Sequence, residues 1–407
     1  MLFEDPKPAT KDEFADLMLR SILAAGETQP LEVDREKFCL IVPGDNANLL
    51  NLGNAYNEFC TVDAELRESV VARFVRVWFA RNRDVPEVFS EAAARLLPAI
   101  RNRSYFELTK MQIVNRGMAA PDWPLRLLAE HFAVCLVYDL PESIHQIQHS
   151  TLEKWQIELD DAMTVATANL RAMTDQPLES IIPGVWQSTW RDNHDIARVL
   201  LTDFIRQHEV QGDPVVLLPN RDTLLLTGSD DETGLGAIAA LAEEALQSPR
   251  PMNGMALRLT GDEWVPFMPS PDHAEFARFR LLLIRSLGQD YEEQKELLNE
   301  ANEKTDDDIF VAGFKARQNN ETGEIVSYCV WSKDVDTLLP KTDEVFFYVS
   351  QGEDKGDIAA RASWASVIEV VGDLMHADGN YPQRFRVVSF PNEKQLRELQ
   401  SRETAER

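Results

Sequence analysis

A local pattern that occurs twice in the sequence constrains the fold more than any other feature. In each copy a helical stretch leads into two short apolar runs that are separated by a proline turn, and a second helix follows. The first copy reads LIVPGD at 40–45 and LLNLGN at 49–54, and the second reads VLLPNRD at 216–222 and LLLTGSD at 224–230. Internal similarity on this scale predicts repeated structural units.

The connection between the two apolar runs of each copy indicates the fold class. A tight turn joins neighbouring strands in the antiparallel direction, and the flanking helices must then cover one face of the sheet. We therefore predict an α+β fold built from repeated helix–β-hairpin–helix units, each forming a two-layer antiparallel-sheet sandwich. This topology argues against a doubly wound parallel sheet with its nucleotide crevice.

Helical and strand periodicities extend this interpretation along the chain. One helix is predicted over 151–173, and residues 86–111 are predicted to be helical first and extended around 105–109. The C-terminal third is predicted to repeat the theme less visibly. Its expected elements are a helix over 274–303, a hairpin over 309–331, a strand over 344–350, a helix over 359–375, a last strand over 384–390 and a charged tail over 393–407.

The length of the chain predicts more than one domain. A chain of 407 residues exceeds what one ordinary hydrophobic core accommodates. Polar, proline-bearing stretches at 117–124 and 269–273 are typical of boundaries. We therefore expect three regions, 1–115, 116–270 and 271–407.

Composition narrows the class of protein. The chain is 44% hydrophobic with a net charge of −27, and the region around 111–270 is especially acidic. Such a chain repels phosphate backbones, so nucleic-acid binding is not expected. No apolar run approaches the ~20 residues of a membrane helix, and the N-terminal segment lacks the pattern of a signal peptide. The four cysteines are far apart, as in a reduced protein, so we expect a cytoplasmic location.

Two charged surfaces are candidate sites for a protein partner. Eight arginines fall within a short segment, and on a helix they would form a basic strip: Arg67, Arg73, Arg76, Arg81, Arg83, Arg95, Arg101 and Arg103. Paired, solvated arginines are the alternative interpretation. From the strip we select Arg73, Arg76, Arg81 and Arg83, and from an acidic loop Asp230, Asp231 and Glu232.

Residue patterns that would carry chemistry are weak. The stretch GLGAIA at 234–239 fits a dinucleotide fingerprint, but it follows a hairpin and three acids, so helix capping explains it better. His145 and His149 have the spacing of one helical face, without the glutamate of a zinc protease. The acidic runs at 306–308 and 334–336 are typical of solvated loops. We therefore predict no cofactor and no metal, and we assign no catalytic residue.

A resemblance to a known family rests on longer strings. These are DREKFCLIV at 34–42, LLPAIRNRSYF at 96–106, AVCLVYDL at 133–140, VVLLPNRDTLLLTGSDDETG at 215–234 and MALRLTGDEWVPF at 255–267. On them the chain resembles the YtpQ-like family of bacterial cytosolic proteins, a family of unknown function, over about residues 10–270. The resemblance implies no catalytic residues, and residues 271–407 fall outside it as an appended domain.

The function expected from these observations is binding. We predict a non-enzymatic protein-interaction module with an adaptor or chaperone-like role and a protein partner. The alternative is a metal-assisted hydrolase whose carboxylates lie in the acidic middle region. The oligomeric state is left open.

Overall fold

The computed structural model of the chain describes residues 9–43, 45–80, 85–141, 143–248, 251–318, 323–352 and 355–406. The chain forms two compact units. Unit 1 comprises Met1–Ala99, Leu136–Asp175 and Gln247–Pro251, and unit 2 comprises Ile100–Cys135, Gln176–Leu246 and Met252–Arg407. Both contain helices together with mainly antiparallel sheets, which confirms the predicted α+β class. The three regions expected from sequence stay a prediction.

Unit 1 begins with the first predicted repeat. Helix α1 (Lys11–Ala24) precedes the antiparallel hairpin of β2 (Cys39–Val42) and β3 (Asp45–Asn51), and β1 (Glu32–Asp34) lies beside β2. The helices that follow are α2 (Gly53–Thr61), the 3₁₀ turn η1 (Ala64–Leu66) and α3 (Arg67–Ala80). They share one apolar core with the strands, in which Phe14, Met18, Ile22, Leu40 and Trp78 are fully buried. The helix–hairpin–helix order is therefore confirmed here.

The remainder of unit 1 is mostly helical. Its elements are α4 (Phe89–Ala92), η2 (Ala93–Arg95), β7 (Ser143–Gln146), α6 (His149–Trp155) and α7 (Leu159–Ala172). Strands β4 (Leu96–Asn102) and β6 (Phe132–Leu140) both run across the boundary between the units. The prediction of one helix over 151–173 is wrong, because Gln156 adopts a left-handed conformation with φ 53° and ends α6.

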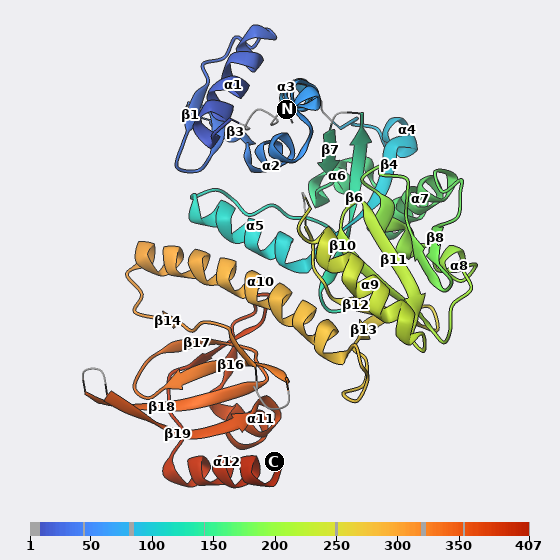
Figure 1. Cartoon of the computed structure of the whole chain (residues 1–407). Helices are drawn as coiled ribbons and strands as arrows, with labels where there is room; N and C mark the ends of the chain where they lie inside the picture. Colours follow the sequence, from blue (N-terminus) through green and yellow to red (C-terminus); the bar gives the residue numbers. More distant parts are fainter. Residues whose placement is uncertain are drawn as a thin grey trace, which may run out of the picture. The chain divides into compact units, whose positions relative to one another are not determined.

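Unit 2 contains a six-stranded antiparallel sheet of order β13-β12-β10-β11-β9-β8. The strands are β8 (Glu179–Ile182), β9 (Val185–Gln187), β10 (Pro214–Asn220), β11 (Thr223–Gly228), β12 (Ala256–Thr260) and β13 (Glu263–Phe267). Helix α9 (Glu232–Ala245) covers one face (Figure 1). Alternate strand residues such as Val215, Leu217 and Leu225 pack against Leu235 and Ile238 of the helix. This two-layer arrangement is the predicted second unit.

The segment that opens this second unit is not the predicted amphipathic helix. It forms a 3₁₀ helix, η3 (Asp195–Leu200), followed by one short turn, α8 (Thr202–Ile205). The Asp195 carboxylate accepts hydrogen bonds from the backbone N–H groups of Arg191 and Asp192. The fully buried Arg198 pairs with Asp192 at 2.8 Å. We infer that these local polar bonds compete with a regular helix and tighten the turn.

Helix α5 (Arg103–Asn115) also belongs to unit 2, and it occupies residues that were expected to be extended. It buries Phe106 and Leu108, and the Asn115 side-chain amide donates to the Leu297 carbonyl of α10 (Phe276–Thr305) at 2.9 Å. The short strand β5 (Leu125–Leu128) pairs antiparallel with residues 132–135 of β6. Packing against α10, which lies far away in sequence, stabilises the helical conformation at 105–109.

The C-terminal part of unit 2 follows α10 and contains two four-stranded sheets. One has the order β15-β16-β18-β19, with β15 (Lys315–Gln318), β16 (Ile325–Ser332), β18 (Glu344–Gly352) and β19 (Lys355–Ser363). The other has the order β14-β17-β21-β20, with β14 (Phe310–Val311), β17 (Thr337–Pro340), β21 (Arg384–Val387) and β20 (His376–Ala377). Two pairs, β16–β18 and β14–β17, are parallel, because the chain passes through β17 before it returns beside β16.

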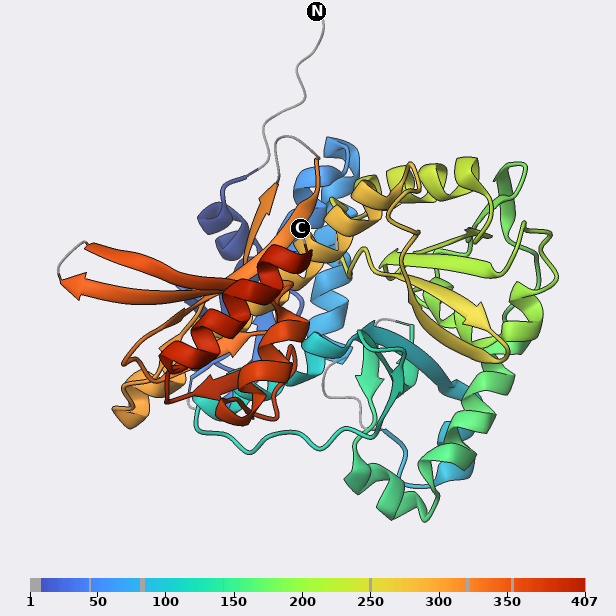
Figure 2. The same cartoon turned by 90° about the horizontal axis from the view of Figure 1, so that it is seen from below.

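Three helical elements complete this part: α11 (Trp364–Val371), η4 (Gly372–Leu374) and α12 (Glu393–Glu406). The predicted helix over 359–375 begins too early, since residues 355–363 pair with β18 and the Ser363 side chain caps α11. The expected charged tail over 393–407 is also wrong. It forms α12, which packs along β19 and buries Leu399 (Figure 2).

Candidate functional site

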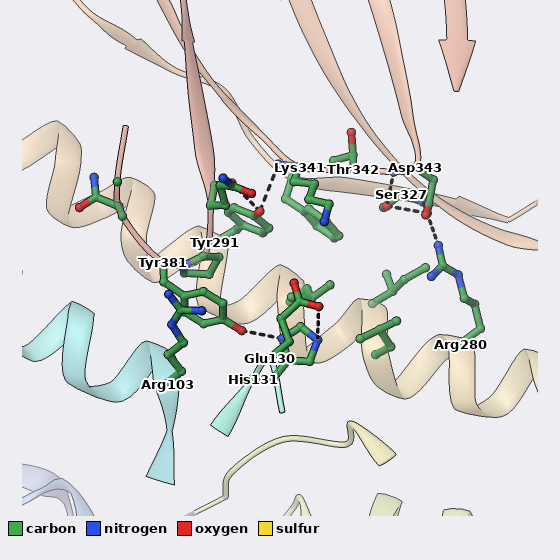
Figure 3. A pocket seen from close by; sticks show the side chains of 18 residues that line it. Arg103, Glu130, His131, Arg280, Tyr291, Ser327, Lys341, Thr342, Asp343 and Tyr381 are labelled. Atoms are coloured by element: carbon green, nitrogen blue, oxygen red, sulfur yellow. Dashed lines mark hydrogen bonds and ion pairs between the residues drawn. The ribbon is translucent and has the colours of Figure 1, made fainter. Parts of the chain in front are cut away.

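A cavity of about 410 Å³ lies entirely within unit 2. Its walls come from the first residue of α5, the turn between β5 and β6, the middle of α10, and the loops that precede β18 and β21. Among the polar side chains that line it are those of Arg103, Glu130, His131, Lys341 and Tyr381 (Figure 3). A pocket of this size accommodates a small ligand or a few residues of a peptide.

A histidine–tyrosine pair forms one side of the cavity. The His131 Nδ1 atom lies 2.5 Å from the Tyr381 hydroxyl oxygen. Burial raises the pKa of Tyr381, so the hydroxyl keeps its proton while it shares this hydrogen bond with Nδ1. Burial also lowers the pKa of His131. The negative charge of Glu130 acts against this shift, whereas the positive charges of Lys341 and Arg103 lower the pKa further. Both rings are therefore neutral near pH 7.

Two cations border this pair. Arg103 holds its guanidinium 4.2 Å above the ring of Tyr381 in a cation–π contact, and its backbone N–H donates to the His131 carbonyl at 2.9 Å. Lys341 extends from the loop before β18, and its side chain is exposed at the rim. Within the described ranges of unit 2, neither cation forms an ion pair with a carboxylate. Figure 3 shows both directed toward the cavity.

The opposite end of the cavity holds a cation that is already neutralised. Arg280 of α10 forms an ion pair with Asp343, and the Ser327 hydroxyl donates to the same carboxylate at 2.6 Å. The Asp343 N–H in turn donates to the Ser327 oxygen at 3.0 Å. Because Asp343 both accepts from and donates to the Ser327 hydroxyl, this hydroxyl stabilises the turn, and no histidine of the described residues hydrogen-bonds to it as a base would.

Apolar side chains line the floor. Leu283 and Leu287 project from α10, and the ring of Tyr291 stacks on Phe314 with centroids 5.1 Å apart and planes 13° apart. The Tyr291 hydroxyl donates to the Gln383 carbonyl at 2.8 Å and accepts from the Lys341 N–H at 3.1 Å. Tyr291 thereby ties together the two loops that carry Lys341 and Tyr381.

A buried arginine holds this floor in place. Arg384 is fully buried, and its guanidinium donates to the carbonyls of Tyr291, Ala312 and Leu338 and to the Gln294 side chain. Burial lowers the pKa of Arg384 to about 10, so it remains charged at neutral pH. The Gln294 amide donates onward to the Pro382 carbonyl at 2.8 Å. Arg384 acts on the cavity through its walls and does not face it.

The residues predicted from sequence to contact a partner lie elsewhere. Arg73 and Arg76 are on α3 of unit 1, where Arg73 pairs with Glu58 and Arg76 is exposed, whereas Arg81 and Arg83 lie outside the described residues. In unit 2, Asp230, Asp231 and Glu232 connect β11 to α9. Their role as partner contacts stays a prediction.

The acidic loop before α9 does cap the helix, as expected. The Asp231 carboxylate accepts from the Gly234 N–H at 2.8 Å, and its side chain is largely buried. A Cβ at Gly234 would lie 2.0 Å from the Thr227 hydroxyl, so close packing of the helix on β11 explains the glycine.

The histidines, the acidic residues and the cysteines were the other candidates for a chemical site. His145 lies in β7 and His149 opens α6, so the four-residue spacing does not place them on one helical face. Across the described ranges, no three His, Cys, Asp or Glu side chains form a group suited to hold a metal ion. The structure describes all four cysteines and none of them is in a disulfide; burial raises the pKa of Cys135 to about 11 and that of Cys329 to about 12.

Sequence reasoning missed the cavity. In the sequence analysis Arg103 is only the last member of the arginine strip, and Leu283, Leu287 and Tyr291 fall within the helix predicted over 274–303 without being singled out. No sequence signal brings His131 to Tyr381, because the two are 250 residues apart and both lie in loops.

Comparison with known proteins gives a family-level similarity. The chain is similar to UPF0354 proteins. Those of Staphylococcus aureus strains JH9, Newman and USA300 are each 25% identical over 162 residues, which covers 38% of this chain and 53% of the relative. The chain thus spans about half the length of the curated relatives it matches. Their names state no activity, in agreement with the expected similarity to an uncharacterised family.

The other comparisons add no relative. No family model matches the chain, and no solved structure matches it. In the described part of the chain, every helix is too short or too polar to cross a bilayer.

Proposed function

We propose that this chain is a non-enzymatic, cytoplasmic interaction protein of the YtpQ-like type that serves as an adaptor, and that the cavity of unit 2 receives its protein partner. The observation that carries the proposal is the combination of groups in the cavity. Two cations that form no ion pair with a carboxylate in the described ranges of unit 2, Arg103 and Lys341, stand beside a neutral histidine–tyrosine pair and an apolar floor. Such groups recognise a ligand by charge and shape.

The polar groups of the cavity support binding over catalysis. A general base works best with a pKa near the working pH, and a nucleophile needs such a base beside it. Here burial holds His131 neutral with Nδ1 already occupied, and Ser327 is bonded to Asp343. The alternative of a metal-assisted hydrolase has no observation among the described residues that favours it.

The proposal is tested by comparing captured proteins. Wild-type chain, Lys341→Glu and Lys394→Glu are each immobilised, and bound proteins are quantified by mass spectrometry. Lys394 is an exposed residue of α12 and provides a matched charge reversal away from the cavity. We expect a set of partners to be retained by Lys394→Glu and lost by Lys341→Glu. Identical sets for all three proteins would contradict the proposal.

The arginine strip is a second proposed contact surface, carried by exposed Arg76 and half-buried Arg73. Charge reversal at Arg73, Arg76, Arg81 and Arg83 tests it in the same capture. An unchanged set of partners would remove the strip from the proposal.

A further inference from the structure

Resting on the proposed function, we infer that the cavity of unit 2 binds the carboxyl terminus of a partner polypeptide that ends in an apolar residue. The inference assigns the terminal carboxylate to Arg103 and Lys341, and the last side chain to the apolar floor. A terminal carboxylate is the negatively charged group that polypeptides share whatever their sequence, and its capture is a recurring mode of peptide recognition.

The charge of the cavity selects an anion. Arg103 and Lys341 lack carboxylate partners within the described ranges of unit 2, although the chain as a whole carries −27. Both cations line the cavity, so their positive charge is available to a ligand that enters it. Guanidinium and ammonium groups bind carboxylates through charge-assisted hydrogen bonds, which are the strong ones.

The position of Arg103 adds to this preference. It is the first residue of α5, a helix of 13 residues whose N-cap, Asn102, makes no side-chain capping bond. The positive end of the helix dipole therefore adds to the charge of the guanidinium. The stacking of Arg103 on Tyr381 holds the guanidinium in one place before a ligand arrives. Less conformational entropy is then lost on binding.

The surroundings favour a singly charged carboxylate over a phosphate dianion. Glu130 lies beside His131, with 3.9 Å between its Oε2 atom and Nε2, so a second negative charge on the ligand would be repelled. On the other side, Leu283, Leu287 and the stacked Phe314 offer an apolar surface to whatever the carboxylate is attached to. A ligand that joins a carboxylate to an apolar side chain can contact the cations and the apolar surface of the cavity at the same time.

The rim allows a longer chain to continue into solvent. Glu130, Lys341 and Gly379 are exposed, whereas Ile284 of α10, Tyr291 of the floor and Tyr381 of the wall are buried. The volume of about 410 Å³ holds one or two terminal residues. The preceding residues of a polypeptide would leave through the rim, which a free small molecule does not require.

The test uses defined probes. Fluorescein-labelled Gly-Ser-Gly-Ser-Gly-Leu is prepared with a free carboxyl terminus and as the carboxamide, and binding to the full chain is measured by fluorescence polarisation. We expect the free acid to bind about tenfold or more tightly than the amide. Arg103→Gln and Lys341→Gln should each weaken the acid about tenfold and leave the amide unchanged, and Lys394→Gln should have no effect.

Competing ligands are separate arms of the same experiment. Equal affinity for acid and amide, or no binding of either, would overturn the inference. So would displacement of the peptide by free leucine or inorganic phosphate at concentrations equal to the peptide's own dissociation constant, since either result would indicate a small-molecule site. If peptide binding fails while partner capture still depends on Lys341, this inference falls and the proposed function stands. Thermal unfolding of each variant verifies that it is folded.

Discussion

The Nδ1 atom of His131 and the hydroxyl oxygen of Tyr381 lie 2.5 Å apart across 250 residues of sequence. This hydrogen bond joins the turn between β5 and β6 to the loop between β20 and β21, and it fixes one wall of the cavity. Since burial keeps both side chains neutral, this wall of the cavity is polar but uncharged. The charge of the site then comes from Arg103, Lys341 and Glu130.

The titration of His131 tests this arrangement. We expect its pKa to lie below the ordinary value of about 6.5 because the ring is buried. Lys341→Gln should raise the pKa by removing a positive charge, and Glu130→Gln should lower it. The imidazole proton resonance followed by NMR against pH gives the value. A pKa above 6.5 in the wild type, or a fall in Lys341→Gln, would contradict the geometry. Because the folded-state pKa is the lower one, this group's contribution to stability is lost as the pH falls below about 6.5.

Asp290 changes the stability of the fold with pH in the direction opposite to His131. Burial raises its pKa to about 7, opposed by a hydrogen bond with Ser104. The unfolded chain ionises this carboxyl near pH 4 and the folded chain does so only near 7, so stability falls as the pH rises between these values. We expect Asp290→Asn to raise the free energy of unfolding by about 1–2 kcal/mol at pH 8, and to make much less difference at pH 4. Urea unfolding at pH 8 and at pH 4 measures the free energies of unfolding of both proteins. An equal effect of Asp290→Asn at the two pH values would contradict the raised pKa.

Arg384 and Arg386 offer a matched pair on one strand. Arg384 is fully buried and satisfies three carbonyls and Gln294, whereas Arg386 is half-exposed and pairs with Asp336. We expect Arg384→Met to lower the free energy of unfolding by about 3–5 kcal/mol, because it leaves buried acceptors unpaired. Arg386→Met should cost less than about 1 kcal/mol. Chemical denaturation distinguishes them, and similar losses for both would show that burial of the network matters little.

Short-range patterns were enough to predict the hairpins. The hairpin β10–β11 follows from two apolar runs and the turn between them. Helix α10 follows from a stripe that runs through Phe279, Leu283 and Tyr291. These elements contain their own signal within a few residues.

Elements that depend on distant packing were predicted wrongly. Residues 105–109 are helical because α5 packs on α10, and residues 355–363 form a strand because β18 offers an edge to pair with. The cavity depends on such contacts entirely, since its residues come from segments that begin at Arg103 and end at Gln383. No local pattern marks His131 or Lys341 as neighbours of Tyr381.

Substitution by alanine should change stability in opposite directions at two helical glycines. A Cβ at Gly234 would lie 2.0 Å from the Thr227 hydroxyl, but a Cβ at Gly288 would make an ordinary contact of 3.7 Å with Phe314. Gly234→Ala should therefore destabilise the chain by about 1–3 kcal/mol. Gly288→Ala should stabilise it by about 0.5–1 kcal/mol through lower backbone entropy in the unfolded state. Thermal unfolding of both variants gives the signs, and a loss at Gly288 would refute the packing described here.

The most direct test of the central claim is the imidazole resonance of His131 during addition of the unlabelled hexapeptide Gly-Ser-Gly-Ser-Gly-Leu. We predict that the free acid shifts this resonance and raises the pKa of His131, because a bound carboxylate stabilises the protonated ring. The carboxamide at the same concentration should shift the resonance much less and leave the pKa unchanged. A resonance that stays in place with the acid, or that moves equally with both peptides, would contradict the account.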